Sequence, residues 1–318
     1  MTHTVIRGTL LAAGLLLGAH AVAHAQTPDS IAAVVNIDDQ NGQNLLRLNA
    51  DGGFVVRGTP GVGAAPTSGE GVRMMWVPAL SAFRAGKIEN FMWNLDWIGD
   101  GSAALGITTL AEEFASFAAG NWAWASAPAA TALGVATTAS GDTSFAAVMG
   151  KARAKGAVAI GAGAEAEGEY ALALGQLAKA TGPGSIAIGP NTASGSGAVA
   201  MMGGSNASGD QSVAIGWFAG TNYKRGAIVL ADYCRASLSD TLFATADNQI
   251  TMRGCGGFRL FTDLAETASV ELAPGGSSWL TVSDVNRKEN FEVLDGEDVL
   301  RRLREVPVMT WNYKSQDP

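Results

Sequence analysis

The central part of the chain alternates large apolar residues with small ones and ends each such stretch on a glycine. Copies of this pattern follow one another in steps of 14, 14, 16, 11, 14, 14, 14 and 13 residues. The 16 and the 11 nearly compensate, which indicates a two-residue shift inside one copy. Spacing this regular predicts a repeat architecture in which each copy is one structural unit. The repeated glycines are Gly106, Gly120, Gly134, Gly150, Gly161, Gly175, Gly189, Gly203 and Gly216.

Each copy contains two short segments with a period of two, which is typical of β-strands. In the first segment, Val158 and Ile160 alternate with Ala157 and Ala159, so both faces are apolar and both are expected to be buried. We expect the large residues to fill the interior of the repeat. The alanine face is then expected to meet another chain, because small side chains let two backbones approach closely. An Asp in place of Ile188 is predicted to disrupt the interior.

The second segment has one polar face, because Lys151 and Arg153 alternate with Ala152 and Ala154. Glycines at the corners permit the positive φ angles of tight turns. The pattern therefore predicts an all-β fold, a parallel β-roll (solenoid) of about nine 14-residue coils over residues 98–220. With coils stacked about 4.8 Å apart, the rod is on the order of 40 Å long.

This repeat resembles the head of trimeric autotransporter adhesins, the YadA-like head. The resemblance rests on the pattern Ser/Ala-x-Ala-Ile-Gly followed by Ala-x-Ala-x-Gly, and it covers residues 98–220. It implies a left-handed parallel β-roll, a homotrimer with three chains side by side, and a head that binds host matrix or other surfaces. No ligand residue carries over, because the motif is structural. The best copies are residues 157–161 (AVAIG), 171–175 (ALALG), 185–189 (SIAIG) and 212–216 (SVAIG).

The segments on both sides of the repeat predict β-hairpin modules. Two apolar stretches, 45–48 and 54–57, flank a glycine-containing turn, and the stretches 250–253 and 258–261 do the same. The likeness indicates one small module used on both sides of the roll. The corresponding predicted regions are an N-terminal hairpin and capping region at 26–97 and a hairpin connector at 221–280.

An irregular, aromatic-rich stretch precedes the first coil. It runs over residues 73–86 and continues to Trp93 and Trp97. We interpret it as a cap on the first open coil, because the ends of a solenoid need to be covered. The alternative is a set of aromatic rings that stack on a sugar.

The first 25 residues are typical of a secretory signal peptide. Arg7 precedes an apolar run at 10–17, and residues 23–25 form an A-x-A cleavage motif. We therefore expect a bacterial protein that is secreted or held at the cell surface. The alternative is an uncleaved membrane anchor, but the run is well short of the roughly 20 residues that span a bilayer. No other segment is expected to be a transmembrane anchor.

Composition narrows the possible chemistry. Charged residues make up only 16% of the chain, apolar residues make up 47%, and the net charge is −8. This balance argues against disorder and against a basic nucleic-acid surface. All three histidines, His3, His20 and His24, lie inside the predicted leader, which excludes histidine-based catalysis and histidine-based metal sites in the mature chain. We expect no cofactor and no metal site.

The two cysteines, Cys234 and Cys255, are too few for a cysteine-only zinc site. Export makes oxidation possible, so we expect a disulfide between them. Two separate buried thiols are the alternative.

The C-terminal residues 281–318 change character. Asp295 is expected to cap a short helix over residues 296–305, and Pro307 ends it. Residues 308–313 then predict a strand, so that this segment is α+β.

The same segment resembles the self-cleaving intramolecular chaperone domain of phage endosialidases and tail spikes. The resemblance implies that the segment helps the chains trimerise and then cuts itself off near Asp284. It also implies a Ser-Lys dyad, because a serine nucleophile needs a base and a buried lysine can act as one. Domains of this kind continue well past the strand, so we expect this one to be truncated at Pro318. The matching residues are Ser283, Asp284, Lys288, Glu289, Asn290, Pro307 and Trp311.

These features favour an exported, trimeric, adhesin-like fibre without metabolic enzyme activity, whose partner is a surface glycan or a matrix protein. One alternative is a purely structural, tail-fibre-like protein without adhesion or cleavage. The other is a glycan-active fibre enzyme, which needs paired carboxylates; Glu165, Glu167 and Glu169 are the candidates that the roll offers.

Overall fold

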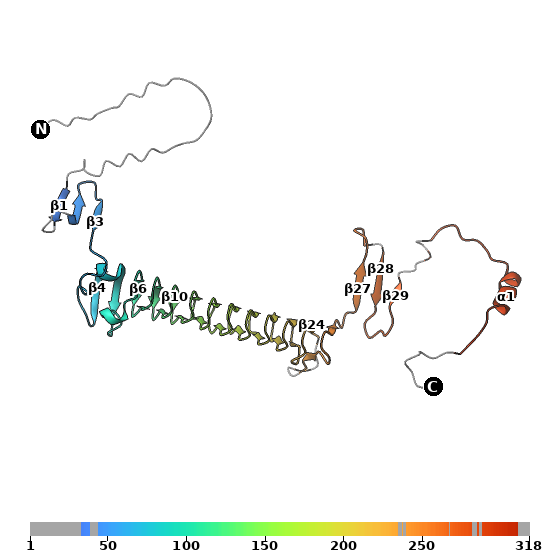
Figure 1. Ribbon diagram of the computed structural model, residues 1–318. Helices are drawn as coiled ribbons and strands as arrows, with labels where there is room; N and C mark the ends of the chain where they lie inside the picture. The colour runs from blue at the N-terminus through green and yellow to red at the C-terminus, as the bar shows by residue number, and fades with distance from the viewer. Residues whose placement is uncertain are drawn as a thin grey trace, which may run out of the picture.

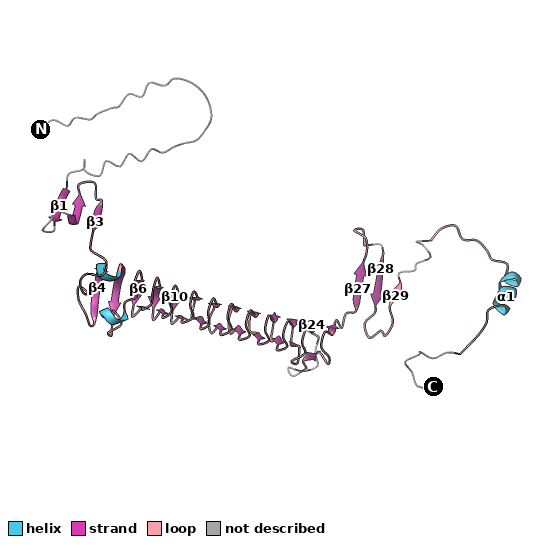
Figure 2. Ribbon diagram, in the orientation of Figure 1, coloured by secondary structure: helices cyan, strands magenta, loops and turns pink. Residues whose placement is uncertain are grey.

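The computed structural model describes residues 33–38, 44–234, 237, 240–266, 268–281, 285 and 288–310. Within these residues the chain forms an elongated row of stacked coils with a three-stranded sheet beyond each end (Figure 1). Strands dominate, one short α-helix lies near the C-terminus, and two short 3₁₀ helices, η1 (Pro78–Leu80) and η2 (Leu95–Trp97), lie near β4 (Figure 2). The predicted leader lies outside the described residues. Among the described helices, none is long and apolar enough to cross a membrane.

One long sheet runs along the whole roll. From β6 to β22 its strands pair in parallel and in register, with 13 or 14 residues between equivalent positions of successive strands. The thirteen strands are β4 (Gly71–Val77), β5 (Ala82–Ile88), β6 (Ala103–Ile107), β8 (Phe117–Asn121), β10 (Thr131–Val135), β12 (Phe145–Ala147), β14 (Val158–Ile160), β16 (Leu172–Leu174), β18 (Ile186–Ile188), β20 (Val199–Met201), β22 (Val213–Gly216), β24 (Ile228–Ala231) and β26 (Ile250–Arg253).

A second, shorter sheet faces it. Each coil contributes one strand to each sheet, so the chain winds between the two and the predicted β-solenoid is confirmed. The ten strands are β7 (Leu110–Ala111), β9 (Trp124–Ala125), β11 (Thr138–Ala139), β13 (Lys151–Ala152), β15 (Glu165–Ala166), β17 (Lys179–Ala180), β19 (Thr192–Ala193), β21 (Asn206–Ala207), β23 (Ala219–Gly220) and β25 (Leu242–Phe243).

The interior of the roll is lined with alanine, and here our expectation was wrong. Ala159, Ala173 and Ala187 are fully buried, whereas Val158 and Ile160 point outward and are only half-buried. Alternation in a strand requires two opposite faces but does not say which is inside. The two sheets lie so close that alanine methyl groups fill most of the space in the middle coils. Among the described residues, buried apolar side chains larger than alanine, such as Trp93 and Val229, occur only near the ends of the roll.

The corners follow the predicted shift. The strand register places Val148 at the corner that Gly161 occupies one coil later, so Gly150 lies two residues beyond its corner. Gly203 is also out of phase, by one residue, because Met202 takes the corner equivalent to Gly189. Val148 and Met202 adopt φ angles of 53° and 71°, which L-residues other than Asn and Asp rarely adopt. A glycine at these corners is therefore favoured but not obligatory.

The N-terminal hairpin is confirmed, and a third strand joins it. Its strands are antiparallel, with Leu46 opposite Val56 and Leu48 opposite Phe54. The three strands are β1 (Ala33–Asp38), β2 (Asn44–Asn49) and β3 (Phe54–Val56).

The C-terminal hairpin is wrong as predicted. Residues 250–253 do not pair with 258–261; they form β26, which pairs in parallel with β24, Ile250 lying opposite Ile228. The roll therefore continues past residue 220, because the edge of β24 offers a partner that extends the apolar rows of the sheet. The second flanking sheet consists of β27 (Phe258–Phe261), β28 (Ser269–Leu272) and β29 (Leu280–Thr281), all antiparallel.

The predicted C-terminal helix is present as α1 (Gly296–Arg304). The Asp295 carboxylate accepts a hydrogen bond from the backbone N–H of Glu297 at 3.0 Å, as an N-cap residue does. The expected strand at 308–313 is absent over residues 308–310, which adopt no regular element, and its remainder lies outside the described residues.

Candidate functional site

The outward face of the long sheet is an almost uninterrupted strip of apolar side chains, two from each strand. Residues directly opposite each other on neighbouring strands share a face, so the register alone places them in two rows. We call these two rows the apolar strip. Thr131 is its one polar member. Its residues are Met74, Trp76, Phe83, Ala85, Ala103, Leu105, Phe117, Ala119, Thr131, Leu133, Phe145, Ala147, Val158, Ile160, Leu172, Leu174, Ile186, Ile188, Val199, Met201, Val213, Ile215, Ile228, Leu230, Ile250 and Met252.

Thirteen strands about 4.8 Å apart make this strip about 58 Å long. Monomeric proteins rarely leave a contiguous apolar patch of more than a few hundred Å² in water. The interior offers little compensation, because an alanine buries only one methyl group, worth about 1 kcal/mol. The strip therefore has the character of a protein interface.

The opposite face of the roll, on the short sheet, is polar as predicted. The Glu165 carboxylate lies 3.7 Å from the Lys151 Nζ and 3.7 Å from the Lys179 Nζ. Arg153 donates to Glu167 at 2.6 Å. Glu165 and Glu167, the candidate acids of a glycan-cleaving enzyme, thus have cationic partners on a flat outer face. Glu169 is exposed. Exposed ion pairs of this kind contribute about 0–1 kcal/mol each.

Two tryptophans interrupt that polar face near its N-terminal end. Trp122 lies at a corner with φ 58°, and Trp124 follows in β9. Their ring centroids are 6.0 Å apart with planes tilted by 37°. Together with Ala136 and Thr138 they line an open cavity of about 150 Å³. Trp122 is 46% exposed. Aromatic rings in this position can stack on the apolar face of a flat ligand.

Neither tryptophan stood out in the sequence analysis. The signal was present for Trp124, because its position holds Thr138, Lys151 and Glu165 in the next three coils. A residue that breaks a structural repeat at an outward position is a candidate for binding.

The first coil is closed by Arg84, which takes the interior position that Ala104 takes one strand later. Its guanidinium donates to the carbonyl oxygens of Phe83, Ser102 and Ala111 at 2.9, 3.1 and 2.7 Å, and to the Ser102 Oγ at 2.8 Å. Burial lowers the pKa of Arg84 to about 10. A charged group inside the roll is tolerated here because its N–H groups find four oxygen acceptors. Two of these, the Ser102 and Ala111 carbonyls, also accept hydrogen bonds from the backbone N–H groups of Phe83 and Gly99.

Trp93 completes this closure. It is fully buried, and its Nε1–H donates to the Thr109 carbonyl at 2.8 Å. The Arg73 guanidinium lies 5.6 Å from the centroid of its ring. Trp93 is therefore not available to a sugar. Trp97 is partly exposed and packs against Phe91 with ring centroids 5.4 Å apart.

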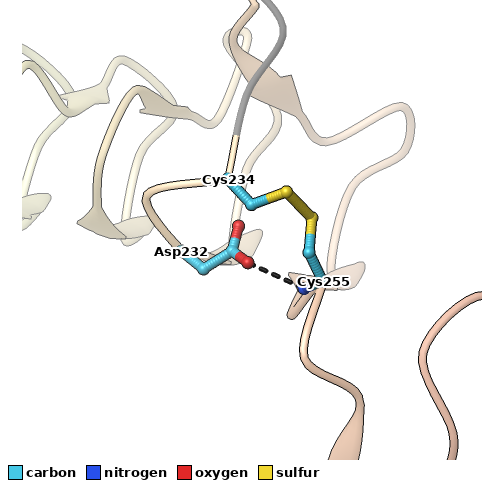
Figure 3. A group of neighbouring side chains, drawn as sticks. All are labelled: Asp232, Cys234 and Cys255. Carbon is cyan, nitrogen blue, oxygen red and sulfur yellow. Dashed lines mark hydrogen bonds between the residues drawn. A yellow bond between two sulfur atoms is a disulfide. The ribbon is translucent and has the colours of Figure 1, made fainter.

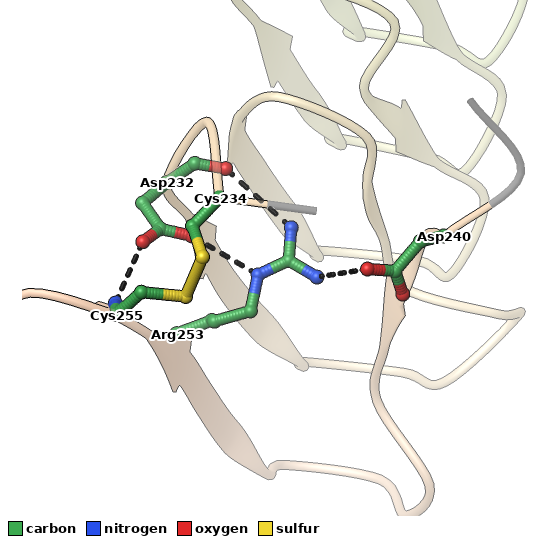
Figure 4. Close-up of a disulfide and its surroundings, with 5 residues drawn as sticks. All are labelled: Asp232, Cys234, Asp240, Arg253 and Cys255. Carbon is green, nitrogen blue, oxygen red and sulfur yellow. Dashed lines mark hydrogen bonds and ion pairs between the residues drawn. A yellow bond between two sulfur atoms is a disulfide. The ribbon is translucent and has the colours of Figure 1, made fainter. Parts of the chain in front are cut away.

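At the other end of the roll, a disulfide joins Cys234 and Cys255, with a Cα–Cα distance of 6.0 Å (Figure 3). It ties the loop that follows β24 to the end of β26. The Asp232 carboxylate accepts a hydrogen bond from the backbone N–H of Cys255 at 2.7 Å and another from the Arg253 Nε at 3.0 Å. Arg253 also donates to Asp240 at 3.3 Å (Figure 4).

These contacts hold the pKa of Asp232 below its usual range. The hydrogen bond from Cys255 is the largest cause, and the Arg253 guanidinium adds to it against the opposing effect of desolvation. A depressed pKa means that the carboxylate stabilises the fold at neutral pH. That stabilisation is lost as the pH falls through the lowered pKa.

The predicted catalytic pair is not brought together in the described residues. Ser283 and Asp284 lie outside them, as does Trp311. Lys288 is exposed, and its backbone N–H donates to the Val285 carbonyl at 3.2 Å. The dyad stays a prediction.

Comparison with known families agrees with the roll. Four segments match the family described as YadA head domain repeat (2 copies), namely residues 125–147, 152–178, 166–192 and 193–219. They span the coils from β9 to β23, so the chain contains YadA head domain repeats. The flanking sheets and the C-terminal segment fall outside the match. No curated protein matches the chain.

Proposed function

We propose that this protein is a trimeric, adhesin-type structural fibre whose chains associate through the apolar strip. The strip itself carries the proposal. It is continuous over thirteen strands, and its two rows present large side chains outward where a solvated sheet presents polar ones. The presence of YadA head domain repeats supports a trimer in particular.

Such an assembly hides one sheet and leaves the other in water. The charged residues of the short sheet, with Glu165 between Lys151 and Lys179, lie on the face away from the strip. This arrangement suits a fibre that is soluble on its outside and apolar along its axis.

The trimer is proposed to act at the bacterial surface after export. The signal-peptide pattern of residues 1–25 supports this location. Mass spectrometry of the exported protein should find Gln26, or a residue within a few positions of it, at the N-terminus. An exported protein that retains Met1 contradicts this part of the proposal.

A surface glycan is the proposed ligand, and Trp122 and Trp124 are the proposed contact. The two indoles lie on the short-sheet side of the roll, which assembly through the apolar strip leaves accessible, and they line an open cavity. Sugar rings have apolar C–H faces that stack on indoles. Their hydroxyl groups can form hydrogen bonds with the side-chain hydroxyl of Thr138.

A glycan array probed with the trimer tests this contact. Trp122→Ala and Trp124→Ala should each reduce binding at least tenfold, whereas Phe114→Ala should not. Phe114 is an exposed aromatic residue on the other side of β8 and serves as the control. Equal glycan binding by the unaltered protein and the three variants excludes the tryptophan site. Binding to matrix proteins but to no glycan favours a matrix protein as the partner.

We further propose that the C-terminal segment belongs to a self-cleaving chaperone. The sequence from Ser283 to Asn290 supports it, and so does α1. Its apolar residues Val299, Leu300 and Leu303 are all exposed in the single chain. An amphipathic helix without a buried residue needs a partner surface, as a segment of a larger assembly does.

A further inference from the structure

The three-stranded sheet before the roll has one entirely apolar face. Val35 pairs with Leu48, and Leu48 pairs with Phe54, so these three side chains share a face. Ile37, Leu46 and Val56 form a second row on the same face. The opposite face carries Asn36, Arg47 and Val55 in the row between them.

The three-stranded sheet after the roll is built in the same way. Phe258 pairs with Leu272, and Leu260 pairs with Val270, which gives a second apolar face. On the other face, Arg259 pairs with Glu271, and the Arg259 Nε lies 3.8 Å from the Glu271 Oε2. The two sheets differ in sequence but share an uncovered apolar side.

Both apolar faces are continuous with the apolar strip. At the N-terminal end, Phe54 and Val56 of the first sheet line a cavity of about 670 Å³ together with Met74, Trp76 and Phe83 of the strip. At the C-terminal end, Phe258 lines a cavity of about 270 Å³ together with Ile215, Leu230 and Met252. One apolar surface therefore extends from the first sheet, along the roll, to the second sheet.

We propose that the two flanking sheets are assembly modules, each covered by the same sheet of the other chains in the fibre. This inference rests on the proposed trimer. A second copy of the chain is the occupant that fits, because chains that meet along the strip bring their flanking sheets together as well. A small antiparallel sheet is stable only when its apolar face is packed against something.

These modules have a task that much of the roll performs only weakly. From β14 to β24 the strip repeats every coil with similar side chains, for example Val158 with Ile160, Leu172 with Leu174, and Ile186 with Ile188. A chain that slides by one coil against its neighbours keeps nearly all of these contacts. Repeated side chains therefore specify only weakly how the chains align with one another along the roll, just as a strand of uniform sequence specifies its pairing register weakly. The flanking sheets do not repeat, so they fix the register.

Thiol protection tests the coverage. Leu260 and Leu280 are similarly exposed in one chain, 56% and 54%, but lie on opposite faces of the second sheet. Both native cysteines are in the disulfide, so Leu260→Cys and Leu280→Cys each add a single reactive thiol. In the assembled protein, maleimide should modify the thiol of Leu260→Cys at least tenfold more slowly than that of Leu280→Cys. Equal rates in a sedimenting trimer overturn the inference but not the trimer, whereas equal rates in a monomer overturn both.

Removal of both end contacts tests the register. The double variant Phe54→Asn with Leu260→Asn should replace the single trimer by a ladder of larger, staggered assemblies, because each slipped chain leaves a free stretch of strip. The control is Val55→Asn with Leu280→Asn, which alters the opposite faces and should keep the single trimer. A double variant that forms the same single trimer as the unaltered protein contradicts the register role.

Discussion

Ala187 and Ile188 are neighbours in β18, yet Ala187 is buried in the roll and Ile188 belongs to the apolar strip outside it. This relationship reverses our sequence-based prediction that an Asp at position 188 disrupts the interior. It also separates the two faces of the long sheet, because one residue packs inside the coil and the next belongs to the surface through which we propose that the chains assemble.

The two positions should respond differently to the same substitution. Ala187→Asp places an unpaired carboxylate between the sheets and should lower the free energy of unfolding by about 4 kcal/mol or more. Ile188→Asp should leave the coil folded but place like charges in the interface, and should weaken assembly by about 100-fold, equivalent to about 3 kcal/mol. Circular dichroism with sedimentation velocity distinguishes them. Loss of β-structure in Ile188→Asp at low protein concentration, where chains are separate, contradicts the assignment of faces.

Arg84 should be essential to the N-terminal end of the roll. Arg84→Met keeps much of the volume but removes the guanidinium's hydrogen bonds to the Ser102 and Ala111 carbonyls, which keep only the backbone N–H groups of Phe83 and Gly99 as donors. This loss should cost about 3 kcal/mol of stability. Urea unfolding measures the loss. Lys87→Met, on an exposed position of the same strand, should change stability by less than about 0.5 kcal/mol. Similar stabilities for the two variants would mean that Arg84 does not close the coil.

The disulfide should stabilise the last coils. Cys234 and Cys255 are 21 residues apart, and a loop of that size corresponds to about 3 kcal/mol on the chain-entropy account. Peptide mapping without reductant should recover the linked pair. Cys234→Ser with Cys255→Ser should increase hydrogen exchange in β24 and β26 more than in β14. Recovery of both residues as free thiols disproves the link.

Self-cleavage is expected if the full-length gene encodes the rest of the chaperone domain. Cleavage should occur near the Ser283–Asp284 bond, with Ser283 as the nucleophile and Lys288 as its base once assembly buries it. Ser283→Ala and Lys288→Ala should give uncut chains that still trimerise. A denaturing gel is the readout. If Ser283→Ala is cut as completely as the unaltered chain, the dyad mechanism is refuted.

Much of the architecture could be predicted from the sequence, because the roll depends on spacing. The parallel coils, the shift at Gly150 and the polar row around Lys151 all follow from position within the repeat. The choice of inner face could not be predicted in this way. Both faces of β14 are apolar, and only the distance between the two sheets selects the row of Ala159 over the row of Val158 and Ile160.

The ends of the roll were harder to predict because they depend on partners rather than on period. Residues 250–253 read equally well as a hairpin strand or as one more coil, and the free edge of β24 decides between them. Arg84 does not stand out by its charge, since its role depends on occupying an alanine position at the end of a stack. The Ser283–Lys288 pair was proposed from a resemblance alone, and its geometry depends on residues outside the described part of the chain.

The central claim is that the apolar strip joins three chains, and sedimentation equilibrium of the unaltered protein at micromolar concentration tests it most directly. The account predicts a single species of three times the mass of the chain, which is 32.5 kDa before removal of the predicted leader, and a shift toward the single-chain mass for Ile188→Asp. A stable species at the mass of one chain, for the unaltered protein under the same conditions, contradicts the account.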